Sequence, residues 1–120
     1  MKKYNSSELV VFKEILLKLK AIEETQVSNL NESLSSITDN GKEENGIDST
    51  SYSVQIESIM NSKSRAVKHL LQINNALLRI DNNRYGVCSV MGELISKERL
   101  MAVPTTTMSI EGKILKEKQK

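Results

Sequence analysis

The chain has 120 residues, of which 38% are hydrophobic and 3% aromatic, and its 17 basic and 15 acidic residues give a formal net charge of +2. A short chain with so few aromatic residues cannot build a thick core, which favours thin packing of helix on helix. The nearly even charge argues against non-specific binding of nucleic acid, because such binding needs clustered cations.

The cysteine count and the hydropathy pattern indicate the compartment. Cys88 is the single cysteine, so an internal disulfide is impossible and a reducing cytosol is favoured. The basic start lacks the apolar run of a signal peptide, and no stretch approaches the ~20 apolar residues of a membrane span. We therefore expect a cytoplasmic protein.

The first predicted element is a helix over about residues 5–38. Apolar residues recur there at steps of three and four, which is the period of a helix: Leu9, Phe12, Leu16, Leu19, Val27, Leu30, Leu34 and Ile37. Asn5 and Glu8 have the spacing of a capping box, which would fix the start of this helix.

Residues 39–51 interrupt the helical pattern. They contain two Asn-Gly pairs and four acids against one lysine, and they lack an apolar period. This composition predicts a negatively charged loop.

A second helix is predicted over about residues 52–82. Its apolar stripe consists of Ile56, Ile59, Met60, Val67, Leu70, Ile73, Leu77 and Ile80. Because neither helix can bury its stripe alone, we expect an all-α fold in which residues 1–83 form a long antiparallel coiled-coil hairpin with the acidic loop at its tip. A compact bundle of bent helices is the alternative.

The tail, residues 84–120, is rich in turn signals. They include Tyr85-Gly86, Met91-Gly92 and Val103-Pro104. Ser109 is a candidate N-cap for a short C-terminal helix that passes through Lys113. A small separate module is therefore expected here.

One run of residues in the tail has a specific spacing. It consists of Tyr85-Gly86-Val87-Cys88, Gly92, Ile95, Arg99-Leu100, Ala102 and Pro104. This run resembles the finger module of the DksA/TraR family, which reads Y-G-x-C-x-x-C-G-x-x-I-x-x-x-R-L-x-A-x-P before a second C-x-x-C. The resemblance implies a bacterial regulator of RNA polymerase with a coiled-coil hairpin and a zinc finger.

The four zinc-ligand positions of that family fall on Cys88, Met91, Ser109 and Gly112, and only Cys88 offers a thiolate. Since structural zinc needs four ligands, we predict a degenerate finger without metal or other cofactor, similar to a zinc-less branch of Bacteroidetes type. An apolar set is expected to replace the metal, with methionine filling gaps: Val90, Met91, Leu94, Ile95, Leu100, Met101, Val103, Met108, Ile110 and Ile114. Cys88 is expected to pack as a small buried hydrophobic group, with a redox role as the minority alternative.

The resemblance also implies a mode of action. Members of the family insert the coiled-coil tip into the secondary channel of RNA polymerase and act near its catalytic centre through an Asp-x-x-Asp-x-Ala motif. The corresponding positions are Asn45, Asp48 and Thr50, so one acid is kept. The structural alternative is that Asp48 merely caps the second helix.

Arg65, Arg99 and Lys113 are the candidate cationic contacts to polymerase or to an alarmone. The positions at which the family contacts guanosine tetraphosphate, the alarmone of the stringent response, fall on Gln72, Val103 and Lys113, of which only Lys113 is cationic. An identical alarmone site is therefore not expected, because a tetraphosphate needs several cationic donors. Arg99 has a structural alternative, which is to tie the finger to the hairpin.

No catalytic constellation and no helix-turn-helix signal is found, so we expect neither an enzyme nor a sequence-specific DNA-binding protein. The main hypothesis is a monomeric transcription regulator that modulates initiation at RNA polymerase. Two alternatives stay open. One is a structural coiled-coil adaptor with a vestigial finger as its cap, and the other is a transcript-cleavage helper similar to the Gre factors, with Glu43, Glu44 and Asp48 holding Mg²⁺.

Overall fold

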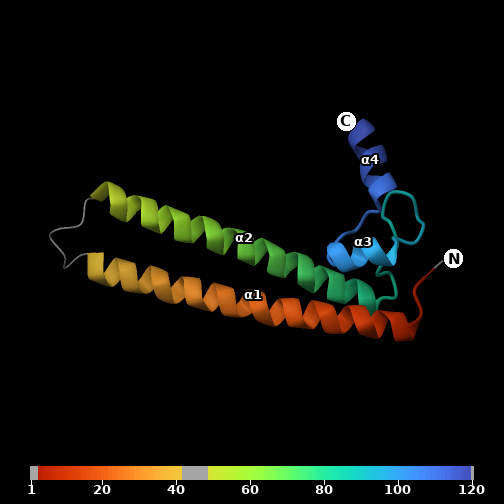
Figure 1. Cartoon of the computed structure of the whole chain (residues 1–120), viewed down its shortest axis with the longest axis horizontal. Helices are drawn as coiled ribbons and strands as arrows, with labels where there is room; N and C mark the ends of the chain where they lie inside the picture. The colour runs from red at the N-terminus through yellow and green to blue at the C-terminus, as the bar shows by residue number, and fades with distance from the viewer. Residues whose placement is uncertain (1–2, 42–48, 120) are drawn as a thin grey trace. The chain divides into compact units, whose positions relative to one another are not determined.

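The computed structural model describes residues 3–41 and 49–119, and over these residues the fold is all-α (Figure 1). The helices are α1 (Ser6–Gly41), α2 (Ser49–Asp81), α3 (Lys97–Ala102) and α4 (Ile110–Lys118). The described part of the chain contains no strand, and its single isolated β-bridge joins Val87 to Leu94. The expected fold class, a helical hairpin followed by a small module with a short C-terminal helix, is confirmed.

The hairpin helices are longer than the sequence pattern indicated. Helix α1 continues to Gly41 and α2 begins at Ser49, so both ends of the expected loop, residues 39–51, are helical. The Asn40-Gly41 pair ends α1 at its glycine rather than before the pair, because glycine is well tolerated at a helix terminus. Residues 42–48 lie outside the described part.

The chain forms two compact units. One contains residues 21–71, and the other combines residues 1–20 with residues 72–120. The expected boundary between residues 83 and 84 therefore falls inside the second of these, which we call the base unit. The base unit joins the first turns of α1, the last turns of α2, and the module with α3 and α4.

The base unit contains one hydrophobic core. Leu9, Phe12 and Leu16 of α1 face the last turns of α2, and the core continues into the module. The ring of Phe12 lies 5.8 Å from that of Tyr4 and 5.4 Å from that of Tyr85. The remaining fully buried members of this core are Ile73, Ala76, Ile80, Cys88, Ile95 and Leu100.

The start of α1 has the predicted capping box. The backbone N–H of Glu8 donates to Asn5 Oδ1 at 2.9 Å, and the backbone N–H of Asn5 donates to Glu8 Oε1 at 3.1 Å. Lys97 Nζ also lies 2.6 Å from Glu8 Oε2, and this lysine, together with the cap, lowers the pKa of Glu8. Two of the free N–H groups of the first turn are thereby satisfied.

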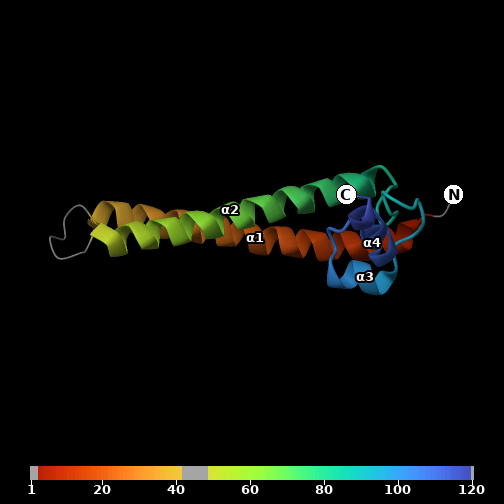
Figure 2. The ribbon, with the colours of Figure 1, turned by 90° about the horizontal axis from the view of Figure 1, so that it is seen from above.

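The other unit, residues 21–71, contains the remaining parts of α1 and α2, which run antiparallel side by side (Figures 1 and 2), and we call it the hairpin unit. Within its described residues only Ala66 is fully buried. Apolar residues such as Val27, Leu30 and Leu70 are half-buried, and Glu23 Oε1 meets His69 Nδ1 at 3.6 Å. This is the thin helix-on-helix packing that the composition favoured. None of the described helices has the length and apolar character needed to cross a membrane.

Candidate functional site

The module starts with two tight turns after α2. Asn83 and Gly86 have positive φ angles of 58° and 81°, and Gly86 touches the ring of Tyr4 so closely that a β-carbon there would collide with it. Beyond these turns, Cys88 N donates to Glu93 O at 2.7 Å and Gly92 N donates to Cys88 O at 2.9 Å. These bonds hold Cys88 in a loop that folds back on itself.

The four predicted ligand positions come together around the sulfur of Cys88. Met91 N and Ser109 N lie 3.5 Å and 3.4 Å from Cys88 Sγ, and Ser109 Oγ lies 3.5 Å from it. A β-carbon built on Gly112 would be 2.5 Å from the same sulfur. The side-chain oxygen of Ser109 also caps α4 by accepting from Gly112 N at 3.0 Å, as predicted.

The hydrogen bonds change the acidity of this thiol. Burial alone raises the pKa of Cys88, but the donors from Met91, Ser109 and Val90 outweigh burial and lower the pKa to about 7. Cys88 is 2% exposed, so it is buried as expected. It differs from the expected inert hydrophobic group because three donors point at its sulfur.

The residues around Cys88 do not fit a structural zinc ion. One thiol, one hydroxyl, a glycine and a methionine side chain that is 46% exposed cannot supply four ligands. Among the described residues no three His, Cys, Asp or Glu side chains cluster. The absence of metal remains a prediction that elemental analysis can test.

The expected apolar core of the module is only partly correct. Ile95 and Leu100 are fully buried, and Val90, Leu94 and Met108 are half-buried. The other expected members are exposed: Met91, Met101, Val103, Ile110 and Ile114. Methionine therefore does not fill the space of a metal, because the backbone of Met91, and not its side chain, faces Cys88. The sulfur of Cys88 and the close approach of Gly112 fill this space instead.

Hydrogen bonds from the side chains of Tyr85, Arg79 and Arg99 help to fasten the segment before α4. Tyr85, which is 1% exposed, donates from its hydroxyl to Pro104 O at 2.7 Å, and Arg79 Nη2 donates to Thr105 O at 3.2 Å. Arg99 Nε donates to Met108 O at 3.5 Å. Arg99 thus ties α3 to the segment before α4 rather than to the hairpin helices, and Arg79 supplies the link to α2.

The predicted alarmone positions line one hollow of the base unit, with a volume of about 360 Å³. Gln72, Val103 and Lys113 are joined there by the guanidinium groups of Arg79 and Arg99. Arg99 was a predicted candidate for this contact, but the sequence did not indicate that Arg79 of α2 lines the same hollow. Both arginines already donate to backbone carbonyls. We name this hollow the α2–α4 groove.

The predicted tip residues Asn45 and Asp48 lie outside the described residues, as do Glu43 and Glu44. Thr50 belongs to the first turn of α2, and its side chain is not described. Arg65 lies in the hairpin unit, where Arg65 Nη2 donates to Ser62 Oγ at 3.2 Å and the side chain lines a shallow hollow with Glu23 and His69.

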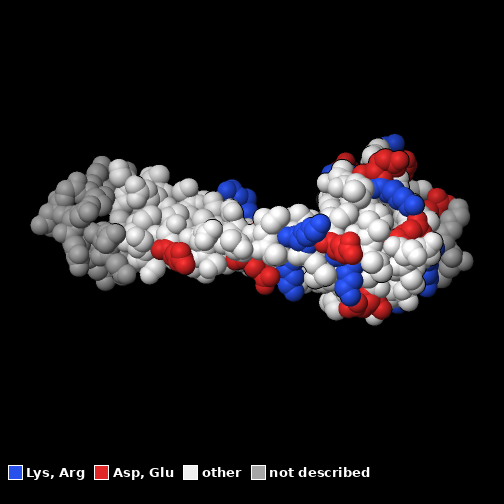
Figure 3. Space-filling model, turned by 60° about the horizontal axis from the view of Figure 1, so that its bottom comes forward, with Lys and Arg blue, Asp and Glu red and all other residues white. Residues whose placement is uncertain are grey.

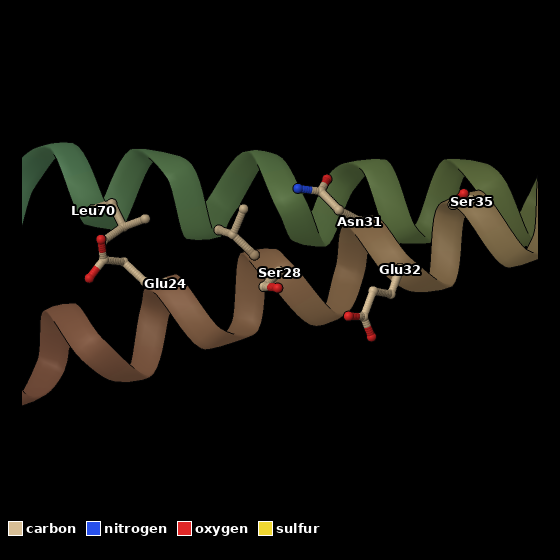
Figure 4. Close-up of a pocket in the computed structure, with 7 residues that line it drawn as sticks. Glu24, Ser28, Asn31, Glu32, Ser35 and Leu70 are labelled. Atoms are coloured by element: carbon tan, nitrogen blue, oxygen red, sulfur yellow. The ribbon is translucent and has the colours of Figure 1, made fainter.

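A hollow of about 580 Å³ lies between α1 and α2 of the hairpin unit (Figure 4). Glu24 and Glu32 are its acidic residues, and Ser28, Asn31 and Leu70 also line it. Its described lining holds no cysteine, histidine or lysine. On the face shown in Figure 3, acidic and basic side chains are interspersed, without a stripe of one sign.

Comparison with known proteins gives both sequence and structural matches. No family model matches the chain. Over 52 residues it is 40% identical to the RNA polymerase-binding transcription factor DksA from two strains of Caulobacter vibrioides, a match that covers 43% of this chain and 37% of the relative. Over 44 residues it is 46% identical to the uncharacterized protein YteA of Bacillus subtilis, a match that covers 37% of this chain and 18% of that protein.

Two solved structures match over nearly the whole chain. The transcription factor DksA2 from Pseudomonas aeruginosa has a TM-score of 0.87 at 26% identity, and the match covers 96% of this chain and 87% of that one. The RNA polymerase binding protein and transcriptional regulator Dks from Chlamydia trachomatis has a TM-score of 0.52 at 27% identity, and the match covers 97% of this chain and 94% of that one. The structural matches therefore cover nearly all of this chain, while the sequence matches span well under half of the length of the curated relatives.

Proposed function

This chain belongs to the DksA/TraR family, and we propose that it binds RNA polymerase and modulates transcription initiation without recognising a DNA sequence. The observation that carries the proposal is the structural match to DksA2, which extends over the hairpin and the module together. The names of the Caulobacter and Chlamydia relatives, which describe polymerase-binding regulators, support it. A regulator of this kind would work in the cytoplasm.

The hairpin unit suits entry into the secondary channel of the polymerase. It is only two helices thick, and residues 21–41 of α1 extend roughly 30 Å at 1.5 Å per residue. A rod of this kind can reach a catalytic centre that a globular surface cannot. We place Asn45, Asp48 and Thr50 near that centre, where a carboxylate could bond mobile polymerase elements or alter the field of a bound metal.

The base unit suits a supporting role outside the channel. It holds the rigid core, and Arg99 and Lys113 line the α2–α4 groove. We propose that this groove contacts the polymerase. Because Gln72 and Val103 replace cationic positions of the family, we do not propose an identical alarmone site, and alarmone dependence is an outcome for the transcription assay.

The decisive experiment is in vitro transcription with the cognate polymerase, with and without the protein and the alarmone, together with a polymerase pull-down. Asp48→Asn should abolish the effect on transcription and leave binding largely intact, while Asp39→Asn, at the end of α1, serves as the matched acid control. If the intact protein does not retain polymerase, the regulator proposal fails and the adaptor hypothesis gains.

A further inference from the structure

The base unit contains a second hollow that shares Arg79 and Thr107 with the α2–α4 groove. Its volume is about 450 Å³, and its lining includes Lys3, Arg79, Arg84, Asn83, Ser89 and Thr107. A volume of this size is within the range of small-molecule sites. We call this hollow the Arg84 pocket.

The charges around the Arg84 pocket have one sign. Lys3, Arg79 and Arg84 line it, and no aspartate or glutamate does. Arg79 is half-buried, and burial lowers its pKa, which means that its charged form is poorly solvated. Within residues 3–37 and 51–119 no carboxylate lies within ion-pair distance of Arg79. A half-buried guanidinium without a counter-ion favours an anionic ligand.

Side chains supply further donors at the pocket. The backbone N–H groups of Arg84, Ser89 and Gly92 are already used, since they donate to Arg79 O at 2.7 Å, Thr107 O at 2.8 Å and Cys88 O at 2.9 Å. The amide of Asn83 and the hydroxyls of Ser89 and Thr107 are exposed and face the same hollow. They could donate to the oxygens of an anion held by the three cations.

We propose that the Arg84 pocket binds a small molecule through a diphosphate group. Three cations without an acid balance a group of two or three negative charges better than a single carboxylate, and the planar fork of arginine matches phosphate oxygens.

Pyrophosphate titrated into the full-length protein at pH 6 and low salt tests this proposal, with ¹⁵N NMR to locate the ligand and calorimetry to measure affinity. The amide signals of Asn83, Arg84 and Ser89 should shift. Arg84→Gln should weaken binding by about tenfold, the loss expected for one charge-assisted contact. Ser89→Asp, an exposed position whose side chain is not needed for the fold, should abolish it.

Lys113→Gln is the matched control, because Lys113 lines the α2–α4 groove and not the Arg84 pocket. Unchanged affinity in this variant supports the proposal. Three results overturn it: no binding of pyrophosphate at millimolar concentration, equal weakening by all variants, or weakening by Lys113→Gln alone. Citrate that binds as tightly as pyrophosphate would overturn the assignment to phosphate. None of these outcomes bears on polymerase binding.

Discussion

The α-carbon of Gly112 lies so close to Cys88 that a β-carbon added there would be 2.5 Å from the thiol sulfur. The same β-carbon would be 3.2 Å from Ser109 Oγ and 3.5 Å from the β-carbon of Val90. Gly112 has an ordinary helical conformation, so the close approach, and not backbone strain, requires glycine at the third position of α4.

Gly112→Ala should therefore destabilise the base unit. Alanine gains about 1 kcal/mol of helix propensity over glycine, but forcing a methyl group against a buried sulfur costs about 1–3 kcal/mol. Because the distance is far below contact, we expect the clash to prevail and the free energy of unfolding to fall by about 1 kcal/mol. Urea unfolding followed by circular dichroism measures this.

The double variant Cys88→Ala/Gly112→Ala provides the control for that prediction. Removing the sulfur makes room for the new methyl group, so the double variant should be more stable than the sum of the two single changes predicts. Strict additivity would show that the sulfur is not what excludes a side chain at residue 112.

The convergence of the four positions predicts that a zinc site can be rebuilt. Two sulfurs on one tetrahedral zinc are roughly 3.8 Å apart, given Zn–S bonds of about 2.3 Å, and Ser109 Oγ already lies 3.5 Å from Cys88 Sγ. The triple variant Met91→Cys/Ser109→Cys/Gly112→Cys should bind one zinc ion per chain. Zinc should raise its Tm relative to the same variant without metal, because the β-carbon added at residue 112 meets Cys88 Sγ when no metal holds the two cysteines apart. Elemental analysis of this variant and of the unaltered protein measures the metal.

A triple variant that folds and binds no zinc would refute the interpretation of these positions as a degenerate finger. The variant that keeps Gly112, and thus has three cysteines, is the matched control. It should bind zinc much more weakly, because one of the four ligands is missing.

Tyr85 should make stability fall at alkaline pH. Burial raises its pKa from 10 to about 12, so the folded state keeps the phenol proton after the unfolded state has lost it. Tyr85 therefore contributes about 2–3 kcal/mol to the free energy of unfolding, which corresponds to a pKa difference of about two. This contribution is fully present below pH 10 and is lost as the pH rises toward 12. The unaltered protein should lose more stability than Tyr85→Phe over this range.

At neutral pH, Tyr85→Phe should cost about 1–2 kcal/mol, since the carbonyl of Pro104 loses its buried donor. Tyr52→Phe in α2 is the control, because Tyr52 is half-buried and has no such bond among the described residues. Equal losses in the two variants would contradict the role given to the Tyr85 hydroxyl.

The sequence predicted the hairpin well because its information is local. The three- and four-residue period and the Asn5–Glu8 cap lie within single helices, and the structure has both. The helix ends differ by about one turn from the prediction, because an Asn-Gly pair does not say on which side of the glycine the helix stops.

The packing of the module was harder to predict, because it has little helix and hence no period that says which apolar residues face inward. Met101 and Ile114 are exposed while Cys88 and Ile95 are buried, although all four are apolar. The donors to Cys88 include backbone N–H groups of residues up to 21 positions away, and no sequence pattern marks them.

Those donors predict how the acidity of Cys88 supports the fold. The pKa is lowered from 9 to about 7, so the folded state holds the thiolate at pH values where the unfolded chain keeps its proton. This stabilisation is present above pH 9 and is lost as pH falls through 7. Between pH 6 and pH 9 the unaltered protein should gain about 2 kcal/mol of stability relative to Cys88→Ala.

Ser109→Ala separates the hydrogen bonds from the burial of the thiol. It removes the donor Oγ, so the pKa of Cys88 should rise, as measured by the ultraviolet absorbance of the thiolate against pH. It also removes the N-cap of α4, at a cost of about 1 kcal/mol. Ser96→Ala, which removes the N-cap of α3 and leaves Cys88 untouched, controls for the loss of a cap. The same rise in both variants would mean that loosening of the module, and not the lost donor, sets the acidity of Cys88.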